Sequence, residues 1–368
     1  MRTSTILVLA VAVLVLFGLV MLESTSGPQG EKLFGNANYF IQRQLAWLAL
    51  GLVAAVFGAR LDYHLWQKSA WLIFGATLVV LVLVYVPPIG LNIKGSHRWL
   101  RLPGGLSFQP SELAKFAAIN ILACWYGARR RERGGFVRGI LIPGVLLAGL
   151  LGLVLFEPDF GATILIGGTC ALMMFVGGAP LFWLGAGVIG GVALLAGLIL
   201  RNPERMGRIM AFLNPEKYAQ DEAFQLMNAL YAFVAGGAWG VGLGEGLQKR
   251  NYLPEAHTDF IFAIIGEELG IIASLGVVAL FVVFMLCGLR ISGRAADAGG
   301  RLMAFGITAV ITLQAAINIG VVTGRLPTKG LPLPFISFGG TSLMVTLFMV
   351  GVLLNIARQG APPSRKRS

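Results

Sequence analysis

The stretch LFWLGAGVIGGVALLAGLIL, residues 181–200, contains no charged side chain. A helix needs about 20 predominantly apolar residues to cross the hydrocarbon core of a bilayer, so this stretch predicts a membrane-spanning helix. Other stretches along the chain have the same character. The sequence therefore predicts an all-α polytopic membrane protein with ten transmembrane helices, at residues 4–22, 44–59, 69–87, 111–128, 138–156, 160–178, 181–200, 259–289, 302–322 and 339–357.

The composition of the whole chain agrees with this prediction. Of its 368 residues, 56% are hydrophobic and only 12% are charged, whereas soluble proteins carry about 25% charged residues. We therefore expect residues 1–368 to form a single integral membrane domain rather than several soluble domains. The cysteines Cys124, Cys170 and Cys287 lie inside apolar stretches, so we interpret them as small hydrophobic residues. No Cys/His spacing in the sequence is typical of a zinc site.

The distribution of basic residues indicates the orientation. Arginine is concentrated in GARRRERGGFVR, residues 127–138, and RKRS ends the chain at residues 365–368. Basic loops favour the cytoplasm and ten spans return the chain to its starting side, so both termini are predicted to be cytoplasmic. The first apolar stretch resembles a signal peptide without a clean cleavage site, and we interpret it as a retained helix. The net charge of +12 then reflects topology and attraction to membrane lipids, not nucleic-acid binding.

The longest segment between predicted spans, residues 201–258, is expected to be a large extracytoplasmic loop. Within it, AFQLMNALYAFVAGGAWG, residues 223–240, places apolar side chains on one face at helical spacing but is too short to span. We expect an interfacial or re-entrant helix there. The glycine-rich run that follows has no strand before it, so it does not indicate a dinucleotide-binding or phosphate-binding loop.

Basic residues also cluster in the predicted outer loops. They can be the ordinary polar surface of loops whose acids neutralise them, or they can form a site for an anion. The second interpretation is attractive because Arg and Lys are the side chains that bind phosphate groups. The candidate residues are Arg98, Lys249, Arg250, His257 and Lys329.

Carboxylates in or beside the apolar stretches need partners or a task, because an unpaired charge there costs roughly several kcal/mol. Glu112 and Lys115 are i, i+3 neighbours that can pair on one helix face. This pair either clamps helices together or shapes a site for phosphate. In the turn that also contains Glu157, we favour Asp159 as the N-terminal cap of the next helix.

Asp259 is the first residue of the predicted span 259–289. From residue types alone, it can equally be an N-terminal cap of the helix or a catalytic group. Glu267 lies about 12 Å deeper along a straight helix at 1.5 Å per residue. The two carboxylates therefore do not suit a two-carboxylate glycosidase, and we assign Glu267 and Glu268 to structure.

Five segments together carry a family resemblance that extends over nearly the whole chain. The chain resembles the SEDS family (shape, elongation, division and sporulation), and it is more similar to the division branch than to the elongation branch. Phe338 and Thr341 stand where a Tyr and a Ser are commoner, and both are mild departures. The segments are GSHRWL at 95–100, QPSELAK at 109–115, EPDFGA at 157–162, YLPEAHTDFIFAIIGEELG at 252–270 and LPTKGLPLPFISFGGTSL at 326–343.

The resemblance implies a ten-helix peptidoglycan glycosyltransferase of the bacterial inner membrane, with its active site on the outer face. Its substrate would be lipid II, a disaccharide-pentapeptide on undecaprenyl pyrophosphate. The position of the family's catalytic acid matches Asp259, which would act as general base on the acceptor 4-hydroxyl while undecaprenyl pyrophosphate leaves and the anomeric centre inverts. Glu112 and Lys115 match charged positions of the family, and Lys115 or Arg98 would lie near the pyrophosphate, with Lys329 and His257 as weaker candidates.

The resemblance also implies partners. A division enzyme of this type would work with a class B penicillin-binding protein and other division proteins. It suggests a divalent cation, Mg²⁺ or Mn²⁺, although the sequence shows no ligand cluster and we assign no metal ligand. Three alternatives stay open from the sequence: a lipid II flippase, an elongation polymerase, and a scaffold that recruits other proteins.

Overall fold

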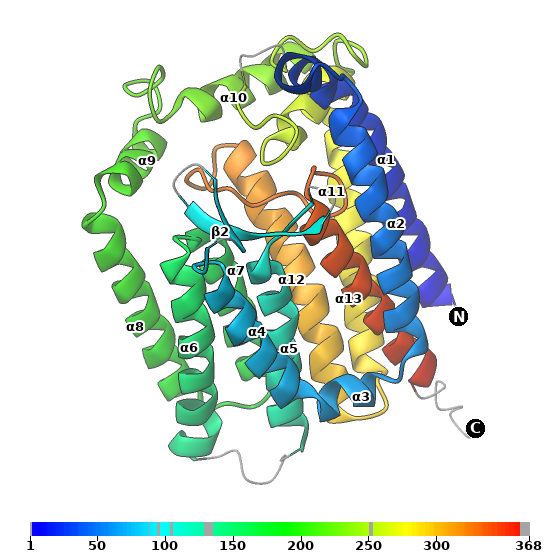
Figure 1. Cartoon of the computed structure of the whole chain (residues 1–368), viewed down its shortest axis with the longest axis vertical. Coiled ribbons are helices and arrows are strands. Elements are labelled where there is room, and N and C mark those ends of the chain that lie inside the picture. The colour runs from blue at the N-terminus through cyan, green and yellow to red at the C-terminus, as the bar shows by residue number, and fades with distance from the viewer. Residues whose placement is uncertain are drawn as a thin grey trace.

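A computed structural model describes residues 2–87, 89–93, 96–103, 106–128, 135–249 and 253–360. Long helices run side by side through most of the molecule, and short helices and a small sheet gather at one end of them (Figure 1). The elements are α1 (Arg2–Phe34), α2 (Tyr39–Arg60), α3 (Tyr63–Lys68), α4 (Ala70–Leu83), β1 (Gly90–Ile93), β2 (Ser96–Arg101), β3 (Ser107–Phe108), α5 (Pro110–Ala128), η2 (Val137–Leu141), α6 (Ile142–Phe156), α7 (Phe160–Val176), α8 (Leu181–Leu200), α9 (Pro203–Leu213), α10 (Phe224–Gly236), α11 (Ile261–Gly293), α12 (Ala298–Val322) and α13 (Gly340–Gln359).

Each of the ten predicted spans coincides with a helix. Among the described residues, seven helices are long and apolar enough to cross a membrane: α1, α2, η2 with α6, α8, α11, α12 and α13. The other three predicted spans are α4 and α7, with 14 and 17 residues, and α5, which contains Glu112 and Lys115. The prediction of an all-α polytopic membrane protein is confirmed.

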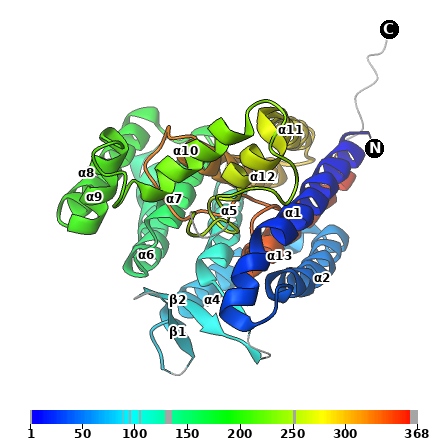
Figure 2. The ribbon, with the colours of Figure 1, turned by 90° about the horizontal axis from the view of Figure 1, so that it is seen from above.

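The core of the bundle is formed by α5, α12 and α13, which are surrounded by the other helices (Figures 1 and 2). In α5 most residues are buried, from Pro110 to Tyr126. Close packing of α13 on α2 depends on glycine, because a Cβ on Gly58 would lie 2.8 Å from the carbonyl oxygen of Phe348.

The two ends of the bundle differ. The antiparallel sheet β1-β2-β3 lies at the same end as α9 and α10, which we call the sheet end (Figure 1). Its register pairs Gly90 with Leu100 and Leu100 with Phe108. At the opposite end, α13 finishes beside the turn between α2 and α3, where Gln359 Nε2 donates to Asp62 Oδ1 at 3.2 Å. The sheet was not predicted from the sequence.

Helix α8 lies at the edge of the bundle (Figure 2). None of its 20 residues, all of which the structure describes, is buried. It is apolar all round, so its surface suits lipid rather than water. It continues through residues 201–202 into α9, and we call residues 181–213 the α8–α9 arm. The one helix predicted in the loop 201–258 corresponds to α10, whereas α9 was not predicted.

Helix α11 is interrupted at Gly270, where φ is 77° and ψ is −178°. The chain that follows α10 packs into this interruption. Ile271 N–H donates to the Gly237 carbonyl at 2.9 Å, and Val241 N–H donates to the Glu267 carbonyl at 3.0 Å. Gly270 is required because a side chain at this positive φ would be strained and would also meet Ala238. The straight helix assumed from the sequence is thus wrong at this point.

Glu267 and Glu268 hold the same loop in place. The Glu267 carboxylate accepts from Leu247 N–H at 2.8 Å and from Gln248 N–H at 3.2 Å. Glu268 accepts from Lys249 Nζ at 2.5 Å and from Ser24 Oγ at 2.7 Å, which links the loop to α1. Both acids therefore have hydrogen-bond partners in the folded chain, which agrees with the structural role expected for them.

Candidate functional site

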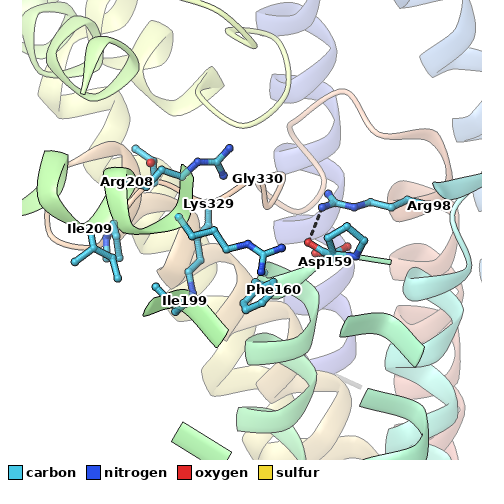
Figure 3. Close-up of a pocket in the computed structure, with 13 residues that line it drawn as sticks. Arg98, Asp159, Phe160, Ile199, Arg208, Ile209, Lys329 and Gly330 are labelled. Atoms are coloured by element: carbon cyan, nitrogen blue, oxygen red, sulfur yellow. Dashed lines mark hydrogen bonds between the residues drawn. The ribbon is translucent and has the colours of Figure 1, made fainter. Parts of the chain in front are cut away.

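A cavity of about 150 Å³ lies at the sheet end, between α7, the α8–α9 arm and the loop that joins α12 to α13 (Figure 3). Its lining comes from β2, from residues 158–161, from side chains between 199 and 209, and from residues 327–330. Four of the lining side chains are cationic, and we call the cavity the cationic pocket: Arg98, Arg205, Arg208 and Lys329. The pocket therefore suits an anionic ligand.

Neighbouring main chain holds Arg98 in the pocket. Arg98 Nε donates to the Glu157 carbonyl at 2.8 Å, and Nη2 donates to the Pro158 carbonyl at 2.7 Å. Both acceptors are uncharged, so the guanidinium keeps its full positive charge. Lys329 enters from the other side (Figure 3), and burial lowers the pKa of its amine. Both residues are candidates from the sequence alone, and the structure brings them together.

The α8–α9 arm supplies the other two cations, which were not among the candidates from the sequence. The Arg205 guanidinium lies over the Phe160 ring, 3.6 Å from the ring centroid. Arg208 pairs with Glu204 at 2.7 Å along the exposed face of α9. Burial lowers the pKa of Arg205, Glu204 opposes this, and Arg208 and Arg98 add to it. The positive charges of Arg205, Arg208 and Arg98 are therefore close enough to influence one another.

Asp159 caps α7 as predicted. Its Oδ1 accepts from Ala162 N–H at 3.0 Å, and its Oδ2 accepts from Gln109 Nε2 at 3.3 Å. The carboxylate therefore fixes the first turn of α7 and joins it to the start of α5. This places Phe160, the first residue of α7, at the wall of the pocket.

Glu157 is fully buried beside this turn. Neither carboxylate oxygen has a hydrogen-bond partner among the described residues. Burial raises the pKa of Glu157 to about 8; Asp159 adds to the shift and Arg98 opposes it. The carboxyl is therefore mostly protonated at neutral pH and does not neutralise Arg98. The sequence alone indicated no role for this residue.

Asp259 lies next to Gly330, which lines the pocket, although Asp259 is not itself among the lining residues. It is in the turn before α11, and its carbonyl accepts from Asn318 Nδ2 at 2.8 Å. The same Nδ2 donates to the Leu331 carbonyl at 2.7 Å, so Asn318 ties the turn to the loop that joins α12 to α13. A Cβ on the pocket-lining Gly330 would lie 2.9 Å from Asp259 Oδ2. The N-cap position of α11 belongs to Phe260, which removes the capping interpretation of Asp259 there.

Glu112 and Lys115 form the predicted pair inside the bundle. Lys115 Nζ donates to both Glu112 oxygens, at 2.7 and 2.8 Å, and to Gln314 Oε1 at 2.8 Å. A lysine amine has three protons, so these bonds use all of them. Gln314 Nε2 in turn donates to the Pro332 carbonyl at 2.8 Å, which connects the pair to the loop that joins α12 to α13. The part played by Gln314 was not predicted from the sequence.

The sequence model of the cell cycle protein family, which covers FtsW, RodA and SpoVE, matches residues 4–361. This chain belongs to that family. The resemblance to SEDS proteins that the sequence motifs indicated is therefore confirmed.

Several members of the family are similar over almost the full length. Probable peptidoglycan glycosyltransferase FtsW of Trichlorobacter lovleyi is 42% identical over 353 residues, which cover 96% of this chain and 92% of that protein. Stage V sporulation protein E of Bacillus subtilis is 39% identical over 361 residues, 97% of this chain and 98% of that protein.

Solved structures in the family show the same fold. The crystal structure of Thermus thermophilus rod shape determining protein RodA gives a TM-score of 0.71 at 27% identity and covers 97% of both chains. A chain from a study of polymerization and crosslinking by a peptidoglycan synthase complex gives a TM-score of 0.79 at 27% identity and covers 96% of both chains. The ten-helix SEDS fold is thus shared.

The remaining proposed site residues of this SEDS protein lie elsewhere. Lys249 is buried and pairs with Glu268, so it contributes to the loop that fills the break in α11. His257 is buried with its ring 4.6 Å from that of Phe40, and it does not line the pocket. Arg250 lies outside the described residues.

A divalent cation does not fit the residues that this structure describes. Within the described ranges, no group of three or more His, Cys, Asp or Glu side chains could hold a metal ion. The cationic pocket itself would repel such an ion. We therefore derive no step through Mg²⁺ or Mn²⁺.

Proposed function

We infer that this chain is a peptidoglycan glycosyltransferase that polymerises lipid II into glycan strands during cell division. The observation that carries this inference is that the Asp259 carboxylate lies beside Gly330, which lines a pocket with four cations. The name of the Trichlorobacter lovleyi relative, which is similar over nearly its whole length, supports the same reaction.

A single displacement needs one base and one stabilised leaving group. Asp259 would take the proton from the 4-hydroxyl of the acceptor sugar as that oxygen attacks C1 of the growing glycan. The C1–O bond to undecaprenyl pyrophosphate breaks, and the configuration at C1 inverts. Arg98, Arg205 and Lys329 would hold the pyrophosphate and stabilise the charge that it gains as it leaves.

The surroundings of the pocket suit an amphiphilic substrate. Ile199, at the end of α8, and Ile209, on α9, line the pocket together with the cations. A charged head in the pocket would therefore have its lipid tail beside α8, whose exposed side chains are apolar. We propose that the sheet end is the outer face of the inner membrane and that both termini are cytoplasmic.

We further propose that α9 and α10 lie at the membrane interface and that a class B penicillin-binding protein is the partner. The solved peptidoglycan synthase complex, in which polymerization and crosslinking are coordinated, supports the pairing. Exposed apolar residues on and after α10, such as Val234 and Trp239, are suited to lipid headgroups.

One feature of the structure favours the flippase alternative, but the contacts around that feature remove the support. A discontinuous helix such as α11 is typical of ion and substrate sites in transporters. Here, however, the interruption at Gly270 is filled by the loop after α10, and Glu267 and Glu268 bond to that loop. The break therefore contains no open site for a coupling ion among the residues described.

The test is polymerisation by the full chain, purified with a class B penicillin-binding protein and supplied with lipid II. Asp259→Asn should reduce the rate about 10²- to 10⁴-fold, the usual contribution of a general base. Asp221→Asn, at an exposed acid of the same outer loop, is the matched control and should keep the wild-type rate. A glycan ladder that persists with Asp259→Asn would refute the assignment of the base. If no ladder forms and lipid II crosses liposomes instead, the chain is a flippase.

A further inference from the structure

The contact between Arg205 and Phe160 joins two parts of the molecule that otherwise touch little. Arg205 belongs to the α8–α9 arm, and Phe160 is the first residue of α7 in the bundle. The arm is weakly anchored, because α8 has no buried residue. The position of the Arg205 charge therefore depends on local contacts more than on the packing of its helix.

Keeping several cations in one small pocket is unfavourable, because Arg98, Arg208 and Lys329 repel Arg205. A carboxylate would hold the guanidinium in place but would also cancel its charge. The face of an aromatic ring attracts a cation through the ring quadrupole and adds no net charge. Phe160 therefore holds Arg205 at the pocket and leaves its charge available to a ligand.

The turn at residues 157–160 also holds Arg98 with uncharged groups. Arg98 donates to the main-chain carbonyls of Glu157 and Pro158, which are also uncharged acceptors. Asp159 directs its carboxylate oxygens to Ala162 and Gln109. Residues 157–160 thus hold two arginines with neutral groups, from β2 on one side and α9 on the other. Arg208 differs, since it pairs with Glu204.

We propose that Phe160 is a positioning residue for the leaving group: its ring holds the Arg205 guanidinium where it binds the pyrophosphate of the lipid-linked substrate. The proposal rests on the proposed function. Phe160 acts through Arg205 and takes no part in bond making or bond breaking. Loss of the ring would release Arg205 from its place at the pocket wall, and the substrate would then have to reorganise it on binding.

The first experiment compares Phe160→Leu with Phe160→Tyr in lipid II polymerisation by the full chain with its penicillin-binding partner. Phe160→Leu keeps apolar volume but loses the aromatic face, whereas Phe160→Tyr keeps the face. We expect Phe160→Leu to raise KM for lipid II about 3- to 30-fold, which corresponds to the usual strength of a cation–π contact. The kcat value should change less, because pyrophosphate is bound both before and during the reaction. Phe160→Tyr should restore the wild-type KM.

Inorganic pyrophosphate provides a readout that does not depend on turnover of the acceptor. It should inhibit the Phe160→Leu variant less than the wild type, by the same factor that KM rises. Phe156→Leu is the matched control, because Phe156 is 78% exposed at the end of α6, and it should leave both values unchanged.

A double-mutant cycle separates positioning from a structural role. If Phe160 acts through Arg205, then Phe160→Leu should cost little extra once Arg205→Gln is present. Additive effects, a Phe160→Tyr variant as impaired as Phe160→Leu, or unchanged pyrophosphate inhibition would each overturn the proposal. If the wild-type chain fails to polymerise lipid II at all, the proposed function itself fails, so the two failures are distinguishable.

Discussion

Charged side chains occur in two kinds of buried surroundings in this protein. In the bundle core, Lys115 meets Glu112, and in the loop that fills the break in α11, Lys249 meets Glu268. In the cationic pocket, by contrast, four cations line one cavity, where main-chain carbonyls hold Arg98 and the Phe160 ring holds Arg205.

The difference separates structural charges from functional ones. A buried pair with its hydrogen bonds complete has no charge left to offer a ligand, so it serves the fold. A pocket in which four cations outnumber the single acid of its described lining, Asp159, is strained by repulsion when empty and stabilised when an anion binds. From the sequence, Lys249 and Lys329 are both candidates for an anion site, and only their partners in the folded chain distinguish them.

The largest effect should come from breaking a buried pair. Lys115→Met leaves the Glu112 carboxylate in the core without its cation, which typically costs about 3–5 kcal/mol of stability. The measurement is thermal unfolding of the purified chain in detergent, followed by intrinsic fluorescence. The double variant Glu112→Gln/Lys115→Met should regain much of the loss, because no uncompensated charge remains. A Lys115→Met protein as stable as the wild type would show that the pair does not hold the core.

The same substitution in the pocket should act on function instead of stability. Burial already lowers the pKa of Lys329, so its charged form is disfavoured in the folded protein. Lys329→Met should therefore leave the melting temperature unchanged or slightly higher. It should raise KM for lipid II about 10- to 100-fold, the usual worth of a hydrogen bond to a charged group. A lower melting temperature with normal KM would assign Lys329 to the fold.

A smaller effect on activity is expected at Gly330, the pocket-lining residue beside Asp259. Gly330→Ala places a methyl group 2.9 Å from Asp259 Oδ2, so the carboxylate has to move. We expect kcat for polymerisation to fall about tenfold with KM nearly unchanged, since small misplacements of a catalytic group are costly. Gly339→Ala, in the same loop, serves as the control, because the nearest side-chain atom there would be 3.5 Å away. Equal kcat values for the two variants would show that the position of Asp259 does not depend on the space beside Gly330.

The last effect concerns Glu157 and is seen only when the pH is changed. Its pKa is about 8 in the folded protein against an ordinary value of 4.5, so the folded state retains a proton that the unfolded state loses. Stability should therefore decline as pH rises from about 4.5 to 8 and level off above that range. Glu157→Gln, which stays neutral, should flatten this decline. Melting temperatures between about pH 5 and 9 test it, and parallel curves for the two proteins would contradict the protonated state.

Much of the fold could be predicted because membrane spans depend on local composition. The ten helices, the pair of Glu112 with Lys115 and the cap at Asp159 all follow from residues close in sequence. The break in α11 was not predictable in this way. It results from a loop, residues 237–242, that is distant from Gly270 in the sequence and packs against it only in the folded chain.

By itself the sequence determined which segments cross the membrane, which family the chain resembles, and that Asp259, Arg98 and Lys329 were candidates. Hydrophobicity and local pairing depend on residues that are close in sequence, so these features can be predicted without the tertiary structure. Only the tertiary structure decided which cations share a pocket, that Arg205 joins them over Phe160, and that Lys249 does not. The physical reason is that the sequence does not show which charges lie beside a lysine or arginine after folding, and those neighbouring charges determine its role.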